Sequence, residues 1–126
     1  MPRLGLSANI ASGDNNPNDN ELNTFNPLYP NLTYFEEAAI LAPQNFYNLD
    51  PNISIQPFES DRFSIDWNVF WRLSKNDAVY VRGLNPLTQT LGVGGYFVTD
   101  ALTGNMGRQI NQHFELGLSY SHFFAG

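Results

Sequence analysis

Few side chains in this chain have the types and spacing that catalysis needs. The two histidines, His113 and His122, have no serine, aspartate or cysteine partner at a recognisable catalytic spacing. The 126 residues include no cysteine, so neither a disulfide framework nor a cysteine-based zinc site is possible. The segment Gly92-Val93-Gly94-Gly95 has no strand-loop-helix context, so it does not predict a phosphate loop. We predict no catalytic residues and no cofactor, and an enzyme is the least favoured class.

One segment resembles the start of a calcium-binding loop. Asp14, Asn16 and Asn18 have the spacing of its first ligands. The sixth position of such a loop is glycine and the twelfth is glutamate, but here these positions hold Asp19 and Phe25. The segment is therefore predicted to be a solvated external loop, and we predict no metal site.

The side chains that could act on a solute lie in segments with a two-residue alternation. Along residues 63–73 the odd positions are Phe, Ile, Trp, Val, Trp and Leu, and the even positions are Ser, Asp, Asn, Phe and Arg. Successive residues of a strand point to opposite faces, so this strand has one apolar face and one largely polar face. A soluble sheet rarely places so many large apolar residues on one exposed face. A transmembrane β-barrel strand does so routinely, because lipid lies outside it and water inside.

The polar faces provide four candidates for the lining of a solute path: Arg3, Asp66, Asn68 and Arg72. Arg72 is expected near the outer end of its strand, where a guanidinium could contact a passing carboxylate. The alternative is that Arg72 and Asp66 only balance other charges in the barrel wall. The aromatic residues could form a sugar-stacking platform, but a lipid-facing or girdle position is favoured; these are Trp67, Trp71, Tyr96, Phe114, Tyr120, Phe123 and Phe124.

The alternation predicts about five strands, at residues 2–12, 45–57, 61–74, 95–107 and 113–124. The connections are long, short, long and short in turn, and a short turn is expected at residues 108–112. Such asymmetry is typical of outer-membrane barrels, with short periplasmic turns and long external loops. In the first long loop, residues 13–44, a capping box at Thr33–Glu36 predicts a short helix. The predicted fold class is all-β: antiparallel transmembrane β-barrel strands, forming a partial barrel with long external loops. A soluble sandwich or lipocalin-like barrel is the alternative.

Composition agrees with this class. Charged residues make up only 14%, against about 25% in ordinary soluble domains. The net charge is −6 and no basic patch is present, so nucleic acid is not a predicted partner. No apolar run reaches the roughly 18 residues of a membrane helix. No signal peptide precedes the first strand pattern, so we expect the true N-terminus of a secreted protein to lie upstream.

Four stretches of the chain resemble the carboxy-terminal part of the bacterial alginate export family of outer-membrane proteins. They are Arg3–Asn9 with Ala11–Asp14, Thr24–Pro30, Asp66–Arg72 and the closing Ser119-Tyr120-Ser121-His122-Phe123-Phe124-Ala125-Gly126. They occur in the right order and span nearly the whole chain.

This resemblance implies that residues 1–126 are the C-terminal part of a large monomeric barrel in the outer membrane. Its partners would be the lipid bilayer and an anionic polysaccharide such as alginate, or related small solutes. The family continues for one more strand after the His-Phe-Phe-Ala-Gly motif, so the chain is expected to be a fragment. An alginate channel is expected to be rich in arginine and lysine. Here the lumen-facing charges are mixed, so a general outer-membrane porin with another substrate stays open as an alternative. A small soluble ligand-binding β-protein is the second alternative, since soluble sheets also alternate.

Overall fold

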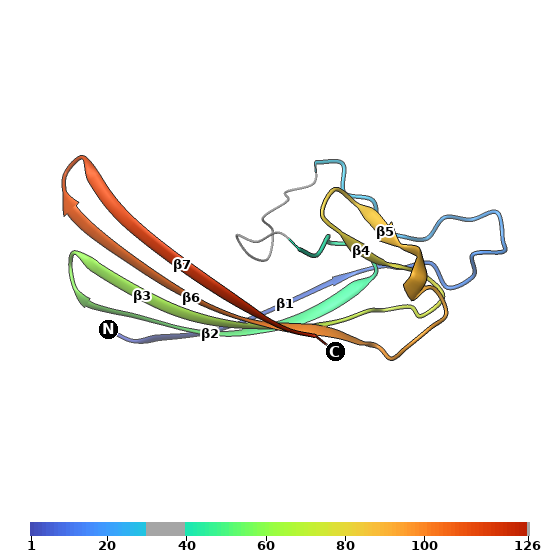
Figure 1. Ribbon diagram of the computed structural model, residues 1–126, viewed down its shortest axis with the longest axis horizontal. Coiled ribbons are helices and arrows are strands. Elements are labelled where there is room, and N and C mark those ends of the chain that lie inside the picture. Colours follow the sequence, from blue (N-terminus) through green and yellow to red (C-terminus); the bar gives the residue numbers. More distant parts are fainter. Residues whose placement is uncertain (30–39, 126) are drawn as a thin grey trace.

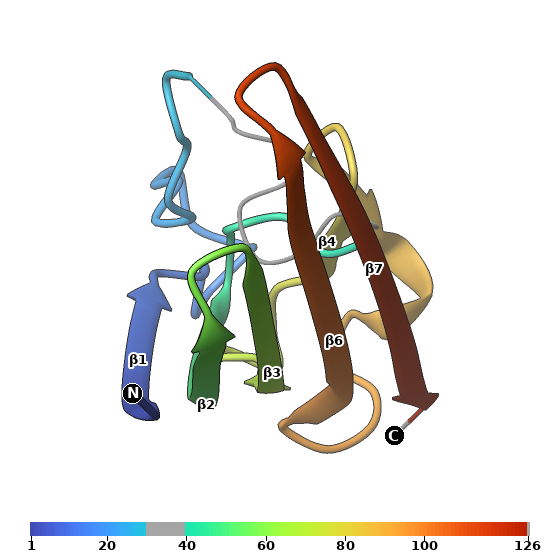
Figure 2. The ribbon, with the colours of Figure 1, turned by 90° about the vertical axis from the view of Figure 1, so that its left-hand side faces the viewer.

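The fold is a curved five-stranded antiparallel sheet, with loops and a small two-stranded hairpin gathered at one end. A computed structural model describes residues 1–29 and 40–125. The strands of the sheet lie in the order β1-β2-β3-β6-β7, and Figures 1 and 2 show them side by side. Their bounds are Arg3–Ala11 (β1), Phe46–Phe58 (β2), Asp61–Trp71 (β3), Phe97–Asn111 (β6) and Phe114–Ala125 (β7). The predicted all-β class, with about five antiparallel strands, is confirmed.

The strand boundaries agree with the alternation, with one clear correction. The short turn predicted at residues 108–112 is wrong, because Arg108 and Gln109 pair with Leu116 and Glu115 and β6 continues to Asn111. The polar side chains of these residues resemble turn formers, but their backbone completes the ladder. The capping box at Thr33–Glu36 lies outside the described residues, as does most of the predicted helix.

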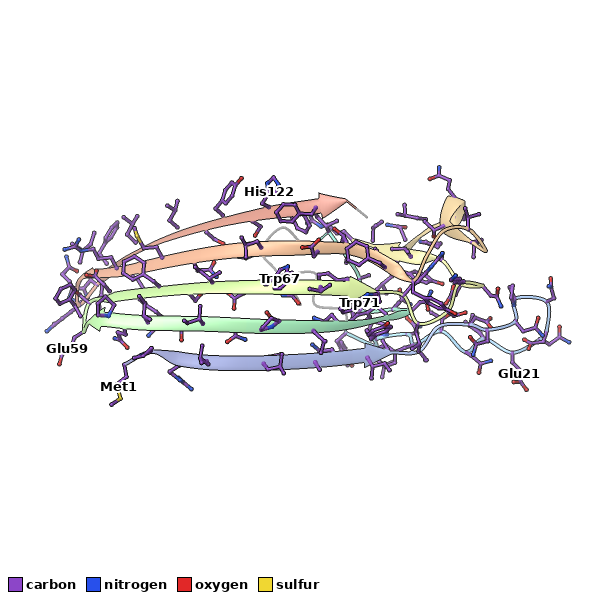
Figure 3. The ribbon with its side chains drawn as sticks, turned by 90° about the horizontal axis from the view of Figure 1, so that it is seen from below. Met1, Glu21, Glu59, Trp67, Trp71 and His122 are labelled. Atoms are coloured by element: carbon purple, nitrogen blue, oxygen red, sulfur yellow. The ribbon has the colours of Figure 1, made fainter. Side chains whose placement is uncertain are left out.

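The connections confirm the predicted long and short alternation. The turns between β2 and β3 and between β6 and β7 are short, and we call their end of the sheet the turn end. Residues 12–45 and 72–96 connect the strands at the opposite end, the loop end. The second connection contains a small hairpin of β4 (Val79–Val81) and β5 (Asn85–Leu87), followed by the 3-10 turn η1 (Thr88–Thr90). Figure 3 shows Met1 and Glu59 at the turn end and Glu21 at the loop end. In the described ranges, no helix is long and apolar enough to cross a membrane.

The sheet has two chemically distinct faces. Residues paired across the strands lie on the same face, so the register places Leu6 beside Pro51 and Ile53 beside Ile65 on one face. This face is convex, and its large apolar side chains are exposed: Leu4, Leu6 and Ile10 are 84%, 72% and 71% exposed. The other face is concave and largely polar. The loops lie on the concave side of the sheet (Figure 1).

The small hydrophobic core lies on the concave face at the loop end. Its buried residues are Ala11, Phe46, Phe70 and Ala101, and Leu41, Val98 and Phe123 pack against them. The cavity between these strand ends and the hairpin measures only about 10 Å³, roughly the space of one water. The loops therefore pack tightly over the loop-end half of the concave face and leave the turn-end half open.

Candidate functional site

The open half of the concave face is a hydrogen-bonded polar wall. Asn105 of β6 donates 3.2 Å hydrogen bonds to Ser64 and Asp66 of β3, and accepts one of 2.7 Å from Ser119 of β7. Asp66 therefore lies on the wall as the alternation predicted, with its carboxylate held by neighbours on two strands. A shallow depression of about 520 Å³ runs along this surface between Arg62, Asn105, Glu115 and Ser119.

Two arginines lie on the same face at the turn end. Arg3 of β1 faces Ser54, and Ser54 faces Ser64 of β3, two residues from Arg62. Both side chains are exposed and line a second depression of about 580 Å³. Neither has an ion-pair or hydrogen-bond partner among the described residues. Sequence analysis proposed Arg3 but missed Arg62, although Arg62 has the same parity as Ser64 and Asp66. Arg62 was not recognised as a wall residue because it lies at the start of the strand, beside a turn.

Asn68 lies on the covered half of the concave face. It is 7% exposed and accepts a 2.6 Å hydrogen bond from Asn48, which in turn accepts one of 3.1 Å from Asn9. These asparagines link β1, β2 and β3 side by side under the loops. Asn68 is therefore shielded, whereas Asp66 two residues away lies at the border of the open wall.

Arg72 is buried at the loop end, with 3% exposure. Its guanidinium donates hydrogen bonds of 2.8 Å to the carbonyl of Gly95 and 2.5 Å to that of Thr90, and a further bond to the carbonyl of Val93. Four positions were proposed as one path, but the structure does not bring them together. Arg3 and Asp66 lie on the open wall, while Asn68 and Arg72 lie under or within the loops.

A buried aspartate joins the two long loops. Asp77 is 6% exposed and accepts four hydrogen bonds: from the backbone N–H of Asp14 and Ala78, and from the hydroxyls of Thr24 and Tyr80. The bond from Thr24 is 2.5 Å long and crosses from the first loop to the second. Burial, and then the hydrogen bond to Asp77, raise the pKa of Tyr80 above its ordinary value of 10.0. Nothing in the sequence pattern marked Asp77, because its role depends on contacts between distant segments.

A second buried side chain, Asn45, also joins the two long loops. Its amide nitrogen donates to the carbonyls of Ser74 and Ala78, and its carbonyl oxygen accepts from the backbone N–H of Ser74. Asn45 has a φ of 49°, a left-handed conformation that asparagine tolerates better than most residues. Gly13 lies so close that a Cβ at this position would overlap the Asn45 side chain. The two loops are therefore joined into one body by the hydrogen bonds of Asp77 and Asn45.

The convex face has aromatic residues towards both ends. At the loop end, Tyr47 stacks on Trp71 with ring centroids 5.1 Å apart, and Trp71 meets the edge of Phe97. Figure 3 shows Trp67, Trp71 and His122 on this side of the sheet. Phe58 and Phe114 are exposed at the turn end. Aromatic girdles that flank an apolar band are typical of a membrane-spanning barrel wall.

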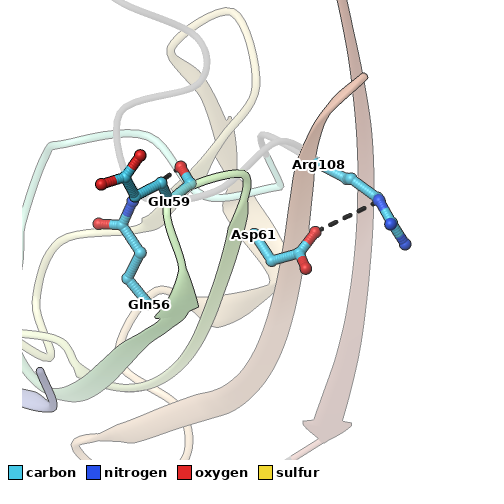
Figure 4. Close-up of polar contacts among 4 residues, drawn as sticks. All are labelled: Gln56, Glu59, Asp61 and Arg108. Carbon is cyan, nitrogen blue, oxygen red and sulfur yellow. Dashed lines mark hydrogen bonds and ion pairs between the residues drawn. The ribbon is translucent and has the colours of Figure 1, made fainter. Parts of the chain in front are cut away.

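Charged residues on the convex face are few and paired. Asp61 and Arg108 face each other on β3 and β6 at the turn end and form an ion pair of 3.5 Å, beside the turn held by Gln56 and Glu59 (Figure 4). Asp100, nearer the loop end, accepts a 2.9 Å hydrogen bond from the indole of Trp67. Sequence analysis overlooked Asp100, although it has the same parity in its strand as Leu102 and Met106 of the apolar face.

The residues with calcium-like spacing use their side chains to accept hydrogen bonds from the nearby backbone. Asp14 accepts a hydrogen bond from the N–H of Asn16, and Asn16 accepts one from the N–H of Asn18. Asp19 repeats the pattern with Glu21. Such Asx turns are common in solvated loops. In the described part of the chain, no group of three or more acidic, histidine or cysteine side chains could hold a metal ion.

The exposed apolar convex face, its aromatic girdles and the polar concave face together define the wall of a transmembrane β-barrel channel. The family model described as alginate export matches residues 1–126, so the chain belongs to the alginate export family. No curated protein and no solved structure matches the chain.

Proposed function

We propose that this chain forms one sector of an outer-membrane channel that carries an anionic polysaccharide, such as alginate, or related solutes. In this proposal residues 1–126 are the C-terminal part of a larger monomeric barrel, and further strands pair with the open edges of β1 and β7. The loop end faces outward and the turn end faces the periplasm, as the lengths of the connections favour. Transport by such a channel needs no catalytic residue and no cofactor, because selectivity follows from pore width and lining charges.

The observation that carries the proposal is the pair of unpaired arginines on the open wall. Arg3 and Arg62 are exposed on the concave face at the turn end, where a solute leaving the periplasm would enter. A guanidinium without a protein partner is free to bind a carboxylate through two parallel hydrogen bonds. Farther along the wall, Asp66 is already held by Asn105 and Ser64. At the entrance, the described part of the wall therefore has two arginines without a protein partner, with Glu115 in the same depression as Arg62, and Asp66 lies farther in.

The test is block of the complete channel by alginate oligomers in a planar bilayer. Arg62→Glu, alone and with Arg3→Glu, should weaken the block and shift the reversal potential toward cations. Low ionic strength is needed, since screening reaches only about 10 Å at 0.1 M. Arg108→Glu is the matched control: Arg108 lies at the same end of the sheet as Arg62 but on the convex face, outside the lumen. Equal effects at Arg62 and Arg108 would reduce the arginines to general surface charge.

Two alternatives make different predictions. A general porin with another substrate would conduct ions normally but ignore alginate oligomers, even in the wild type. A soluble ligand-binding β-protein would be monomeric and would unfold cooperatively in buffer without detergent. We expect this chain alone to aggregate there, because its convex face exposes a broad apolar surface and β1 and β7 are unpaired edges.

A further inference from the structure

Arg72 joins the two legs of the loop that carries the β4–β5 hairpin. Its own backbone belongs to the outgoing leg, at the end of β3. Its side chain reaches the returning leg, where the carbonyls of Thr90, Val93 and Gly95 accept its hydrogen bonds. Three of its nitrogens are thus used on one short segment, which the planar fork of a guanidinium can do and a single ammonium cannot.

Further bonds fix the same two legs. The N–H of Arg72 donates to the carbonyl of Tyr96 over 2.8 Å, and the N–H of Gly92 donates to that of Lys75 over 2.7 Å. The N–H of Val79 donates to the Thr90 hydroxyl over 2.9 Å. Arg72 lies at the centre of these contacts and is buried, so its contribution is a fixed loop geometry and not an exposed charge.

The hairpin held by these legs covers the concave face. Val79 and Tyr80 of β4 line the 10 Å³ cavity against Phe46 and Phe70, which point from the sheet toward the loops. Val81 forms a bridge with Leu41 of the first loop. Figure 1 shows β4 and β5 above the concave side of the sheet at the loop end. In a closed barrel, this hairpin would occupy part of the lumen near the outer mouth.

We propose that Arg72 is a positioning residue, which clasps the legs of residues 72–96 and thereby holds the β4–β5 hairpin as a fixed constriction of the channel. The inference rests on the proposed function, since it needs a closed barrel with the concave face inside. It assigns Arg72 an effect on pore width through backbone carbonyls, without contact with the solute.

The first test compares Arg72→Lys with Arg72→Gln in the complete channel, by single-channel recording in potassium chloride. Lysine keeps the charge and loses the fork, whereas glutamine loses both. If Arg72 holds the hairpin in position, both variants should give the same result. The hairpin is released in each, so the conductance and the current fluctuations should both increase. If Arg72→Lys behaves like the wild type and only Arg72→Gln shifts the reversal potential, Arg72 acts by its charge and the proposal is wrong.

The second test removes the constriction itself, by deleting residues 79–87. The deletion should raise the conductance, and adding Arg72→Gln to it should change little, because two changes that act through one element are not additive. An unchanged conductance after the deletion overturns the proposal, even if the Arg72 variants fail to assemble. A full additional effect of Arg72→Gln in the deleted channel overturns it as well.

These outcomes are separate from those of the proposed function. The recordings use only small ions, so they do not depend on a polysaccharide. A channel that was not blocked by alginate oligomers but had a higher conductance in both Arg72 variants would contradict the proposed substrate. It would support the proposed positioning role of Arg72. Failure of the wild type to conduct any ion would contradict the channel, and with it both proposals. Heat-modifiable mobility on a gel confirms the assembly of each variant before recording.

Discussion

The indole N–H of Trp67 donates a 2.9 Å hydrogen bond to the carboxylate of Asp100, and both residues lie on the largely apolar convex face. A carboxylate facing lipid is costly unless it is paired or lies near the headgroups. Asp100 satisfies both conditions, because it is bonded to Trp67 and lies within the loop-end aromatic girdle.

Removal of the indole donor should therefore destabilise the barrel, and removal of both partners should restore much of the loss. We expect Trp67→Phe to cost about 1–3 kcal/mol, the usual cost of an unpaired polar group, and Trp67→Phe with Asp100→Leu to cost less. Urea unfolding of the complete protein in lipid vesicles measures both. Additive costs in this double-mutant cycle would mean that the two side chains do not interact.

The facing of β3 predicts opposite effects for two adjacent substitutions. Ile65→Arg places a charge on the exposed apolar face, where it should cost roughly 2–4 kcal/mol near mid-membrane. Ser64→Arg points into the open depression of the concave face and should be tolerated. Asn68 is a poor control for this purpose, because it is buried under the loops. Assembly is scored by heat-modifiable mobility, and equal tolerance would contradict the assignment of the faces.

Gly13→Ala should loosen the joined loops. The added Cβ would overlap the Asn45 side chain, which is itself buried and fixed by three hydrogen bonds. Overpacking of this kind costs about 1–3 kcal/mol. Limited proteolysis of intact cells should show faster cleavage in residues 12–29. Gly104→Ala is the matched control, since a Cβ there meets no atom within 4 Å, and its cleavage should match the wild type.

Alkaline pH should weaken the contact between Tyr80 and Asp77. The pKa of Tyr80 is raised in the folded protein by burial and by the bond to Asp77, so the tyrosine ionises more readily in the unfolded chain. Its stabilising contribution is therefore complete below pH 10 and is lost as the pH rises through the folded value. The melting temperature of the wild type should fall toward that of Tyr80→Phe above pH 10. A constant difference up to pH 11 would contradict this assignment.

The sequence allowed the strands and their faces to be predicted because two-residue alternation reports directly on which side chains share a face. Val69 and Trp71 could be assigned to the apolar face in this way without any knowledge of tertiary contacts. The covering of the concave face could not be predicted. Phe46 and Phe70 appear as apolar exceptions on a polar face, and only the folded loops explain why they are buried.

The same limit applies to the candidate site. The two-residue alternation placed Arg3 and Asp66 on the wall, and it could have placed Arg62 there as well. It contains no information about irregular segments. Arg72 follows the end of β3, so its environment depends on where residues 90–95 return. Asp77 and Asn45 owe their burial to partners far away in the chain, and no local pattern indicates them.

The Asx turns in the first long loop make residues 17–22 a suitable site for the insertion of a foreign peptide. Residues 17–22 are exposed, and the side-chain bonds there are made to backbone only two positions away. The bonds that join the loops begin on either side of this stretch, at Asp14 and Thr24. A foreign epitope inserted between Asn18 and Asp19 would extend from the loop end, where Glu21 lies in Figure 3. It would leave intact the hydrogen bonds that join the two loops. Antibody could then reach the epitope on living cells while the barrel below keeps its native shape.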